Sequence, residues 1–185
     1  RGAILAVSSP NVTSGSIGET GSLEELGGTN VHGKITGLID KIVDSDEEAL
    51  LAIRKFLSYL PDHNRMAPPV VPVPAGADDR GTDLPDLVPI ERRKTYDIRR
   101  AIEAIVDPDS FFELKERFAR PAVTGLARLG GQTVGIIATN PRYKGGALDA
   151  DSCSKITNFI VLCDSFNVPL VFMADTPGFL IGTEA

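Results

Sequence analysis

The feature that most constrains the fold of this chain is a proline-rich stretch that runs from Pro61 to Pro89. It holds seven of the thirteen prolines in the sequence, together with two glycines. Because proline fixes φ and has no amide hydrogen to donate, the stretch cannot form a regular helix or a central strand. We therefore predict a linker between two domains, with a long surface loop within one domain as the alternative. The predicted parts are residues 1–62, the linker 63–89 and residues 90–185.

The first part is predicted to contain two short strands ahead of its helix. An apolar run at residues 3–7 is typical of a buried strand, and the Ser-, Thr- and Gly-rich residues 11–21 are typical of a loop. Residues 22–26 predict one helical turn, stopped by two glycines. Loose alternation over residues 34–43 indicates a second strand.

A helix over residues 46–60 is the clearest element of the sequence. Ser45 and Glu48 fit a capping box, in which each side chain satisfies an orphan amide of the first turn. Pro61 ends the helix, because the residue before a proline is pushed out of the helical region. Four residues at helical spacing form an apolar stripe that we expect to face a core. They are Leu50, Ile53, Leu57 and Leu60.

The second part is predicted to be a mixed α/β unit. A short helix over residues 97–106 precedes a hairpin, whose strands at 123–128 and 133–138 are joined through Gly130 and Gly131. After a loop at 140–146 come a helix over 152–166, a buried strand over 170–174 and a glycine-containing loop. We expect Ile156, Phe159, Ile160 and Cys163 of that helix to face the core. A helix that leads into a short apolar strand suits an α/β fold with a covered sheet.

Composition excludes several classes of protein. The formal net charge is -6 with both signs interspersed, which argues against a nucleic-acid binder. No apolar run reaches the roughly 20 residues of a membrane span. Cys153 and Cys163, ten residues apart in one predicted helix, are too distant to bond, so we interpret both as reduced thiols in a cytosolic or matrix-like compartment. No spacing of His, Cys, Asp or Glu indicates a metal site.

Three glycine-containing loops could hold an anionic oxygen with backbone amides. They contain Gly27 and Gly28, Gly145 and Gly146, and the residues 176–182. Glycine permits close approach of the backbone, and two amides aimed at one point can stabilise an oxyanion. The third loop follows a predicted strand, where ligands of α/β sheets bind. Taken alone, the first pair is more often a helix stop, and the second fits a plain turn.

Side chains that could carry chemistry are few. We expect the single histidine of the first part, His32, to be structural rather than catalytic. Basic residues could meet a phosphate or carboxylate, although a solvated surface charge is the simpler interpretation for each. These residues are Lys34, Arg142 and Lys144. Asp149 and Asp151 precede a predicted helix, where capping is the first explanation.

As a set, the segments resemble the carboxyltransferase (beta) subunits of biotin-dependent acyl-CoA carboxylases, nearest to the propionyl-CoA carboxylase beta type. The resemblance lies in an E-E-L-G-G-x-x-x-H segment at residues 24–32, a Tyr-Asp start at Tyr96, and the V-x-G-x-A-R…V-G-I-x-A hairpin. It continues through the helix with Lys155 and through the D-T-P-G-F loop at residues 175–179. Order and spacing agree over nearly the whole sequence, which reads as an internal fragment of about a third of a family subunit.

The resemblance implies a crotonase-like α/β fold in two related domains, with the linker between them. It implies carboxyl transfer from carboxybiotin to the α carbon of a short acyl-CoA, with backbone amides holding both oxyanions. Biotin would be the cofactor, carried by a partner, and acyl-CoA the substrate. Expected partners are a biotin carboxylase, a biotin carrier subunit and further copies of the chain in a dimer-based hexamer. The expected location is cytoplasmic, or the mitochondrial matrix in a eukaryote, with no nucleic acid and no membrane bound.

The resemblance also implies roles for the glycine loops. Gly27 and Gly28 would line the acyl-CoA side, and the biotin side would be lined by Gly145, Gly146, Thr176, Pro177, Gly178 and Phe179. The family's two principal oxyanion glycine pairs would lie outside this sequence. We therefore expect no catalytic residue within it and no activity of the fragment alone. The loop at 140–146 departs from the family in its basic, bulky Arg142-Tyr143-Lys144, which puts the loop's role in question.

Two other functions fit the same residues. A decarboxylase subunit of the same fold would run the transfer backwards, and a non-catalytic scaffold would have lost its glycine pairs. A plain enoyl-CoA hydratase is disfavoured, because a single domain of that type would not need the linker and a second part.

Overall fold

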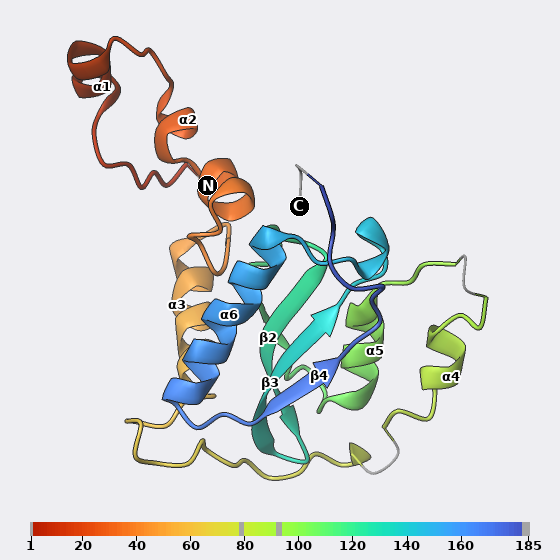
Figure 1. The fold of residues 1–185 in the computed structure, drawn as a ribbon. Helices are drawn as coiled ribbons and strands as arrows, with labels where there is room; N and C mark the ends of the chain where they lie inside the picture. The colour runs from red at the N-terminus through yellow and green to blue at the C-terminus, as the bar shows by residue number, and fades with distance from the viewer. Residues whose placement is uncertain (1, 78–79, 92–93, 183–185) are drawn as a thin grey trace.

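The computed structural model describes residues 2–77, 80–91 and 94–182. Its centre is a four-stranded sheet in the order β1-β2-β3-β4 (Figure 1). The strands are β1 Phe112–Leu114, β2 Ala122–Leu129, β3 Gln132–Thr139 and β4 Leu170–Met173. The first three pair antiparallel, and β4 pairs parallel with β3. The carboxyl ends of β3 and β4 therefore lie at the same edge of the sheet.

The β2–β3 hairpin is confirmed, and its turn has the expected chemistry. Gly130 and Gly131 both adopt positive φ, of 57° and 77°, a pair of conformations that favours glycine in a two-residue hairpin turn. The Asp107 carboxylate accepts hydrogen bonds from both glycine amides, at 2.9 and 2.7 Å. Asp107 is buried, so these two charge-assisted bonds fix the turn against the end of the preceding helix.

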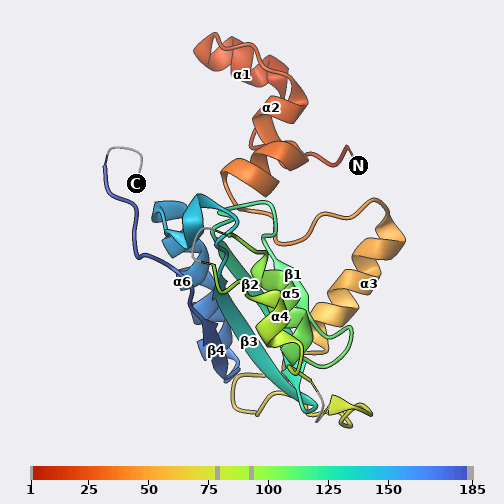
Figure 2. The same ribbon diagram turned by 90° about the vertical axis from the view of Figure 1, so that its right-hand side faces the viewer.

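Helices cover both faces of the sheet (Figures 1 and 2). Helix α5, Ile98–Ile105, packs on one face against side chains such as Val123 and Ile136. Helices α3, Asp46–Leu57, and α6, Ala150–Ser165, contribute to the core on the other face. Side chains alternate between the two clusters along β2 and β3, as the two-residue period of a strand requires. The predicted helices around residues 97–106 and 152–166 are thus confirmed.

Three of the four residues predicted to form the buried stripe face outward instead. Leu50, Ile53 and Leu57 are each more than half exposed. Leu60 packs against the core as predicted, together with Phe56 and with Tyr59 just beyond the helix. Two apolar stripes at helical spacing run along this helix, and the larger aromatic side chains occupy the core. The predicted capping box is half formed: Ser45 accepts from the Glu48 amide, but the Glu48 carboxylate accepts from the amide of Asp44.

The predicted elements ahead of α3 are largely wrong. Residues 3–7 form no strand, and helix α1, Pro10–Ile17, stands where a loop was expected. Ser9 caps α1 and proline occupies its first turn, so local signals outweigh the Ser-, Thr- and Gly-rich composition. A short π-helix, η1 Val31–Ile35, replaces the start of the strand expected at residues 34–43. The helical turn is confirmed as α2, Leu23–Gly27, with a capping box on Ser22.

Elements α1, α2 and η1 form an arm that projects beyond the sheet (Figures 1 and 2). No residue of α1 is buried. Apolar side chains along the arm, including Val7, Val12 and Ile17, are more than half exposed. The arm is held by local caps and short backbone contacts rather than by a core of its own, which explains why apolar patterning there misled the prediction.

The proline-rich stretch passes along the lower end of the sheet in Figure 1. Val70 forms an isolated bridge with Gln132, and Asn167 donates to the carbonyl oxygens of Asn64 and Met66. Contrary to expectation, the stretch includes one helical turn, α4 Leu84–Leu87. Its Pro85 lies in the first turn, where the missing amide hydrogen has no helical partner in any case.

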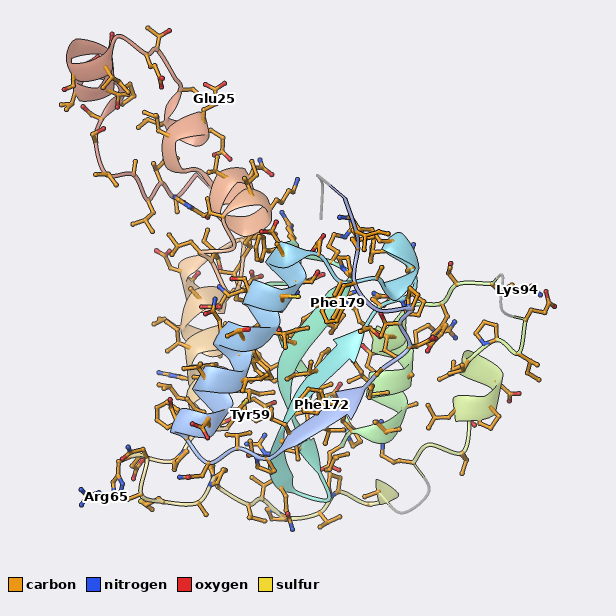
Figure 3. All side chains as sticks on the ribbon, in the orientation of Figure 1. Glu25, Tyr59, Arg65, Lys94, Phe172 and Phe179 are labelled. Atoms are coloured by element: carbon orange, nitrogen blue, oxygen red, sulfur yellow. The ribbon has the colours of Figure 1, made fainter. Side chains whose placement is uncertain are left out.

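Strand β4 is half exposed rather than buried, because it is the edge strand of the described sheet. Phe172, at its centre, is 61% exposed and labelled in Figure 3. Strand β1 was not predicted at all, being only three residues long. Short strands give too little alternation to be recognised in a sequence.

Among the described residues, Lys155 is the least exposed charged side chain. It is 1% exposed on α6, and its Nζ donates to the carbonyl oxygens of Lys115, Phe118 and Ala122 at 2.9, 2.9 and 2.7 Å. Burial lowers the pKa of the Lys155 ammonium to about 8, a fall that the Glu113 carboxylate opposes. The side chain is therefore charged at neutral pH, with three donors for three acceptors. Lys155 thus ties α6 to the loop between β1 and β2.

Replacing Lys155 by Met should destabilise the fold strongly. The two residues have similar helix propensity, so the main loss is that of the donor to three carbonyl oxygens. We expect the free energy of unfolding to fall by about 3 kcal/mol, measured by urea denaturation. Arg54→Met, at an exposed position of α3, is the control and should change little. Equal stability of the Lys155→Met variant and the unaltered protein would contradict this role.

Candidate functional site

Two of the three glycine loops meet at the carboxyl ends of β3 and β4. The loop after β3 includes a 3-10 turn at Lys144–Gly146, and the loop after β4 begins at residue 174. The Leu148 amide donates to the Gly178 carbonyl at 2.9 Å, and the Leu180 amide donates to the Leu148 carbonyl at 2.8 Å. These bonds form a short parallel bridge between Leu148 and Phe179. The structure thus brings Gly145 and Gly146 to the same edge as the segment 176–179.

A second pair of hydrogen bonds connects the two loops where β3 and β4 end. The Thr139 hydroxyl donates to the Asp175 carbonyl at 2.8 Å and accepts from the Asp175 amide at 2.7 Å. Gly146, with φ of 81°, lies directly above this point: a Cβ there would be 2.4 Å from the Asp175 carbonyl oxygen. Close approach of two backbones is the reason for glycine at this position.

Gly178 shapes its loop rather than presenting free donors. Its amide donates to the Thr176 hydroxyl at 3.0 Å and its carbonyl accepts from Leu148. Leu148 makes both hydrogen bonds of this parallel bridge, to Gly178 and Leu180, so the amide of Phe179 between them faces away from Leu148. The Phe179 side chain is 71% exposed (Figure 3). Nothing lies within 4 Å of a Cβ built on Gly145 or Gly178, which leaves open space beside both loops.

The pair Gly27 and Gly28 is not part of this edge. It lies at the end of α2 in the projecting arm (Figure 1). The Gly27 carbonyl accepts from the Leu5 amide, and a Cβ on Gly27 would be 2.1 Å from the Leu5 carbonyl oxygen. Within the described chain, Gly27 permits close packing against the Leu5 backbone, whereas a Cβ on Gly28 would clash with the Glu24 carboxylate.

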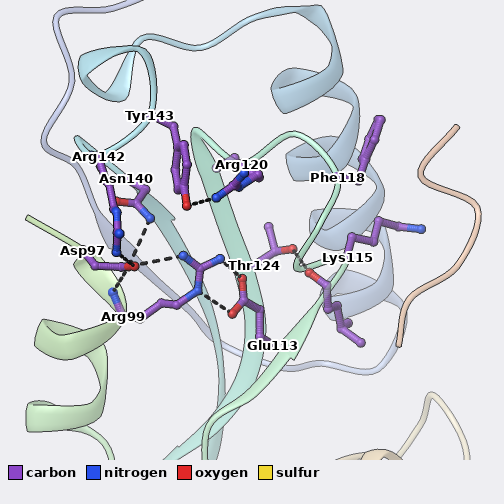
Figure 4. Close-up of polar contacts among 12 residues, drawn as sticks. Asp97, Arg99, Glu113, Lys115, Phe118, Arg120, Thr124, Asn140, Arg142 and Tyr143 are labelled. Atoms are coloured by element: carbon purple, nitrogen blue, oxygen red, sulfur yellow. Dashed lines mark hydrogen bonds and ion pairs between the residues drawn. The ribbon is translucent and has the colours of Figure 1, made fainter. Parts of the chain in front are cut away.

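An ion network braces the edge from below (Figure 4). Arg99 of α5 binds Glu113 of β1 through Nε and Nη2, at 2.7 and 2.5 Å, and also pairs with Asp97 at 3.2 Å. Asp97 accepts in addition from the buried Asn140, which directly follows β3, at 3.1 Å. Burial acts to raise the pKa of Asp97, but hydrogen bonds from Arg99 and Asn140 hold it below its ordinary value. This network could not be predicted from the sequence, because Glu113 lies in β1, a strand too short to be recognised there.

The basic side chains singled out in the sequence have mixed roles. Arg142 pairs with Asp97 at 3.4 Å, and Lys144 pairs with Asp149 at 2.7 Å. Lys34 lines a cleft of about 510 Å³ that also contains Arg117 and Arg120, two residues that the sequence analysis did not single out. The His32 Nε2 donates to the Leu5 carbonyl at 2.7 Å, and its Nδ1 accepts from the Thr36 hydroxyl at 3.0 Å, as expected of a structural histidine.

Asp149 caps helix α6 as predicted. Its carboxylate accepts from the amide and hydroxyl of Ser152, at 2.8 and 2.6 Å, and from Lys144. Burial would raise the pKa of Asp149, but the hydrogen bonds from Lys144 and Ser152 outweigh it and lower the pKa to about 2. The cap therefore connects the start of α6 to the loop that carries Gly145.

Tyr96 and the thiols complete the titratable groups of interest. The Tyr96 hydroxyl donates to the Asp175 carboxylate at 3.0 Å, and burial together with this bond raises the pKa of Tyr96 to about 12. Both cysteines are free, and burial raises the pKa of the Cys163 thiol to about 12.

Over the described residues, His, Cys, Asp and Glu side chains form no cluster of three that could hold a metal ion. No helix in that part of the chain is long and apolar enough to cross a membrane.

Comparison with known proteins assigns the chain to a family. The family model described as the carboxyl transferase domain matches residues 2–185, and the chain belongs to this family. The chain is 42% identical to the uncharacterized carboxylase YngE of Bacillus subtilis, over 98% of the chain and 35% of that protein. It is 39% identical to the propionyl-CoA carboxylase carboxyltransferase subunit of Haloferax mediterranei, over 97% of the chain and 35% of that protein.

A solved structure gives the same answer for the fold. The crystal structure of transcarboxylase 12S with methylmalonyl-coenzyme A and methylmalonic acid bound matches with a TM-score of 0.91 and 38% identity, over 97% of this chain and 34% of that one. The crotonase-like α/β fold and the resemblance to propionyl-CoA carboxylase beta subunits are therefore confirmed. The chain spans about a third of the length of these relatives.

Removing the Asp149 charge should change how stability depends on pH. Because the pKa is lower in the folded protein than its ordinary 3.8, the ionised carboxylate stabilises the fold above about pH 4, and this contribution is lost as pH falls towards 2. Asp149→Asn keeps a capping side chain and should cost about 2 kcal/mol at pH 7. Thermal unfolding from pH 2 to 7 should show the two proteins converging at the acidic end. A constant difference at every pH would exclude the charge as the cause.

The two adjacent glycines of the β3 loop provide a matched comparison. Gly145→Ala adds a methyl group in open space, so it should cost only about 1 kcal/mol for the left-handed backbone. Gly146→Ala adds the same strain and a clash with the Asp175 carbonyl oxygen, so the free energy of unfolding should fall by about 3 kcal/mol. Chemical denaturation measures both. Equal losses would show that the contact between the two loops does not matter.

Proposed function

We propose that the protein to which this chain belongs transfers a carboxyl group between carboxybiotin on a carrier protein and the α carbon of a short acyl-CoA. Membership in the carboxyl transferase domain family supports this proposal. So does the similarity to a propionyl-CoA carboxylase carboxyltransferase subunit and to a transcarboxylase that binds methylmalonyl-coenzyme A.

The observation that carries the proposal is the pairing of two glycine loops at the carboxyl ends of parallel β3 and β4. Ligands of α/β sheets bind at such an edge. Gly145, Gly146 and Gly178 all have positive φ, and two of them border open space. A neutral ring with polar edges, such as the ureido ring of biotin, suits backbone groups and an apolar neighbour like Phe179 better than it suits charged side chains.

We assign Gly145, Gly146 and the segment Thr176, Pro177, Gly178 and Phe179 to the biotin side of the site. Gly27 and Gly28 belong to the acyl-CoA side in this proposal, contributed through their position on the projecting arm. The separation of the two sets in the described chain agrees with a site completed by a second copy of the chain. The oxyanion donors themselves would come from glycine pairs outside this sequence, so the chain supplies walls and positioning.

Carboxybiotin, when bound, would supply the carboxyl group, and the biotin anion left after its loss would accept the α-proton removed from the acyl-CoA. The chain's own part is to hold the ring at the β3–β4 edge and to keep the two loops in register through the Leu148–Phe179 bridge. Such positioning contributes to rate because it fixes the reacting groups in a near-attack arrangement. No side-chain base is needed for this chemistry.

The same proposal includes partners, organisation and location. A biotin carboxylase and a biotin carrier subunit would supply carboxybiotin, and the chain would assemble as a dimer-based hexamer; the similar transcarboxylase 12S is described as a hexamer. Residues 1–62 and 90–185 would be parts of two related domains, joined by the linker 63–89. The location would be the cytoplasm, or the mitochondrial matrix in a eukaryote.

A carboxyl-exchange assay on the natural full-length protein tests the proposal. Supplied with a carboxylated biotin carrier, it should form carboxylated product from at least one of acetyl-, propionyl-, butyryl- or methylcrotonyl-CoA. Gly178→Val should lower this rate at least about tenfold, because a β-branched side chain cannot adopt φ near 120° without moving the loop. Product should be followed by mass spectrometry of the acyl-CoA.

The matched control is Gly76→Val. Gly76 also has positive φ and open space around its Cβ, but it lies in the proline-rich stretch. The Gly76→Val substitution imposes comparable backbone strain away from the β3–β4 edge, so the rate of carboxyl transfer should be preserved. No transfer to any of the four substrates would reject the proposed function, and equal rates for the two valine variants would remove the Gly178 loop from the site.

A further inference from the structure

Three cations that have no carboxylate partner among the described residues converge on one cleft. The cleft of about 510 Å³ is lined by Lys34, Arg117, Arg120 and Tyr143, and the same four residues line an adjoining cavity of about 410 Å³. They come from three separate segments: η1, the loop between β1 and β2, and the loop after β3. The formal net charge of the chain is -6, so this gathering of positive charge opposes the overall balance.

Other charges around the cleft are largely neutralised. Arg99 is paired with Glu113 and Asp97, Arg142 with Asp97, and Lys144 with Asp149. Over the described residues, Lys34 and Arg117 have no ion pair or side-chain hydrogen bond, and Arg120 has only Tyr143. Among the described residues that line the two cavities, Glu116 and Asp151 are the carboxylates outside these pairs, and two negative charges do not balance three cations.

Tyr143 adds a hydrogen-bond donor to the cations. The Arg120 guanidinium lies 3.9 Å from the centre of the Tyr143 ring and donates to its hydroxyl (Figure 4). Because the hydroxyl oxygen accepts this bond, its own hydrogen is free to point into the cleft. Stacking on the ring also limits the positions that Arg120 can take.

Intramolecular contacts hold the backbone that carries these cations in place before any ligand binds. Lys155 binds three carbonyl oxygens of the loop from Lys115 to Ala122, which contains both arginines. The Lys115 side chain donates to the Gly37 carbonyl and pairs with Asp40 at 3.0 Å. These contacts connect the loop to the segment that follows η1 and thus fix Lys34 relative to Arg117. A preformed arrangement lowers the entropic cost of binding.

We propose that this cleft binds the phosphate group of a small-molecule ligand. Arginine forks match phosphate oxygens in pairs, and a lysine and a tyrosine hydroxyl can reach the remaining oxygens. Three cations suit a doubly charged phosphate better than a single carboxylate. The phosphate can come from coenzyme A, whose nucleotide end carries three phosphates, or from a free phosphate or diphosphate compound. The arginines and the lysine are exposed, so the group is reached from solvent.

Calorimetric titration of the natural full-length protein tests the site, with inorganic phosphate, inorganic pyrophosphate, coenzyme A and pantetheine as probes. Arg117→Ala should weaken binding of the phosphate-bearing probes about tenfold or more, and Lys34→Ala should act in the same direction. Arg65→Ala, at an exposed cation far from the cleft (Figure 3), is the matched control and should leave binding unchanged. Among the described residues, Arg117 has no ion pair or side-chain hydrogen bond to lose, so the unfolding temperatures of the two variants should be equal.

The outcomes separate the two sources. If coenzyme A binding depends on Arg117 and pantetheine binding does not, the site holds the nucleotide phosphates of the substrate. If only phosphate and pyrophosphate depend on Arg117, the ligand is a free phosphate compound. If no phosphate-bearing probe binds more weakly to Arg117→Ala than to Arg65→Ala, the proposal is wrong. Binding is measured without acyl transfer, so failure of the proposed carboxyl transfer would leave this result standing.

Discussion

The hydrogen bonds between Leu148 and the backbone of Gly178 and Leu180 are the interaction on which this account depends. Parallel pairing of β3 and β4 already sends both chains out at one edge, but it does not hold the following loops together. The bridge does so, and Gly146 permits it by letting the Asp175 carbonyl approach to a distance that any side chain would prevent. A pair of flexible loops thereby becomes a single defined surface.

Two polar clusters, one partly buried and one fully buried, support this surface. The Asp97–Arg99–Glu113 network connects α5, β1 and the residue after β3, while Lys155 connects α6 to the loop between β1 and β2. Buried charges are costly unless they are fully paired, and here each has close partners. Their value lies in fixing the relative positions of segments that are distant in the sequence. The hydrogen bonds from Lys155 also position the loop that carries Arg117 and Arg120 of the proposed phosphate cleft.

Much of the second part of the fold could be predicted from the sequence. The hairpin was recognisable because Gly130-Gly131 separates two apolar runs, and α6 and β4 because a long amphipathic segment precedes a short apolar one. Features that depend on contacts between distant segments of the chain could not be predicted. Burial of Lys155 needs three carbonyl oxygens from a loop some forty residues earlier in the chain, and no local pattern indicates it. On α3, two apolar stripes compete, and only the packing of Phe56 decides between them.

The site was predicted in part for the same reasons. Glycine loops after strands are visible in a sequence, so Gly145, Gly146 and the Thr176–Phe179 segment were found, and the structure brings them together. The gathering of Arg117 and Arg120 with Tyr143 at one cleft depends on the fold of a loop that has no regular pattern. Gly27 and Gly28 were grouped with them by resemblance, and in the described chain they lie apart on the arm.

The most direct test of the central claim is a crystal structure of the natural full-length protein with biotin bound. The account predicts the ureido ring against the joined loops, in contact with the Gly145–Gly146 turn and the Gly178–Phe179 segment, with the Leu148 bridge intact. Biotin bound on another face of the molecule, or the two loops separated in the complex, would contradict it.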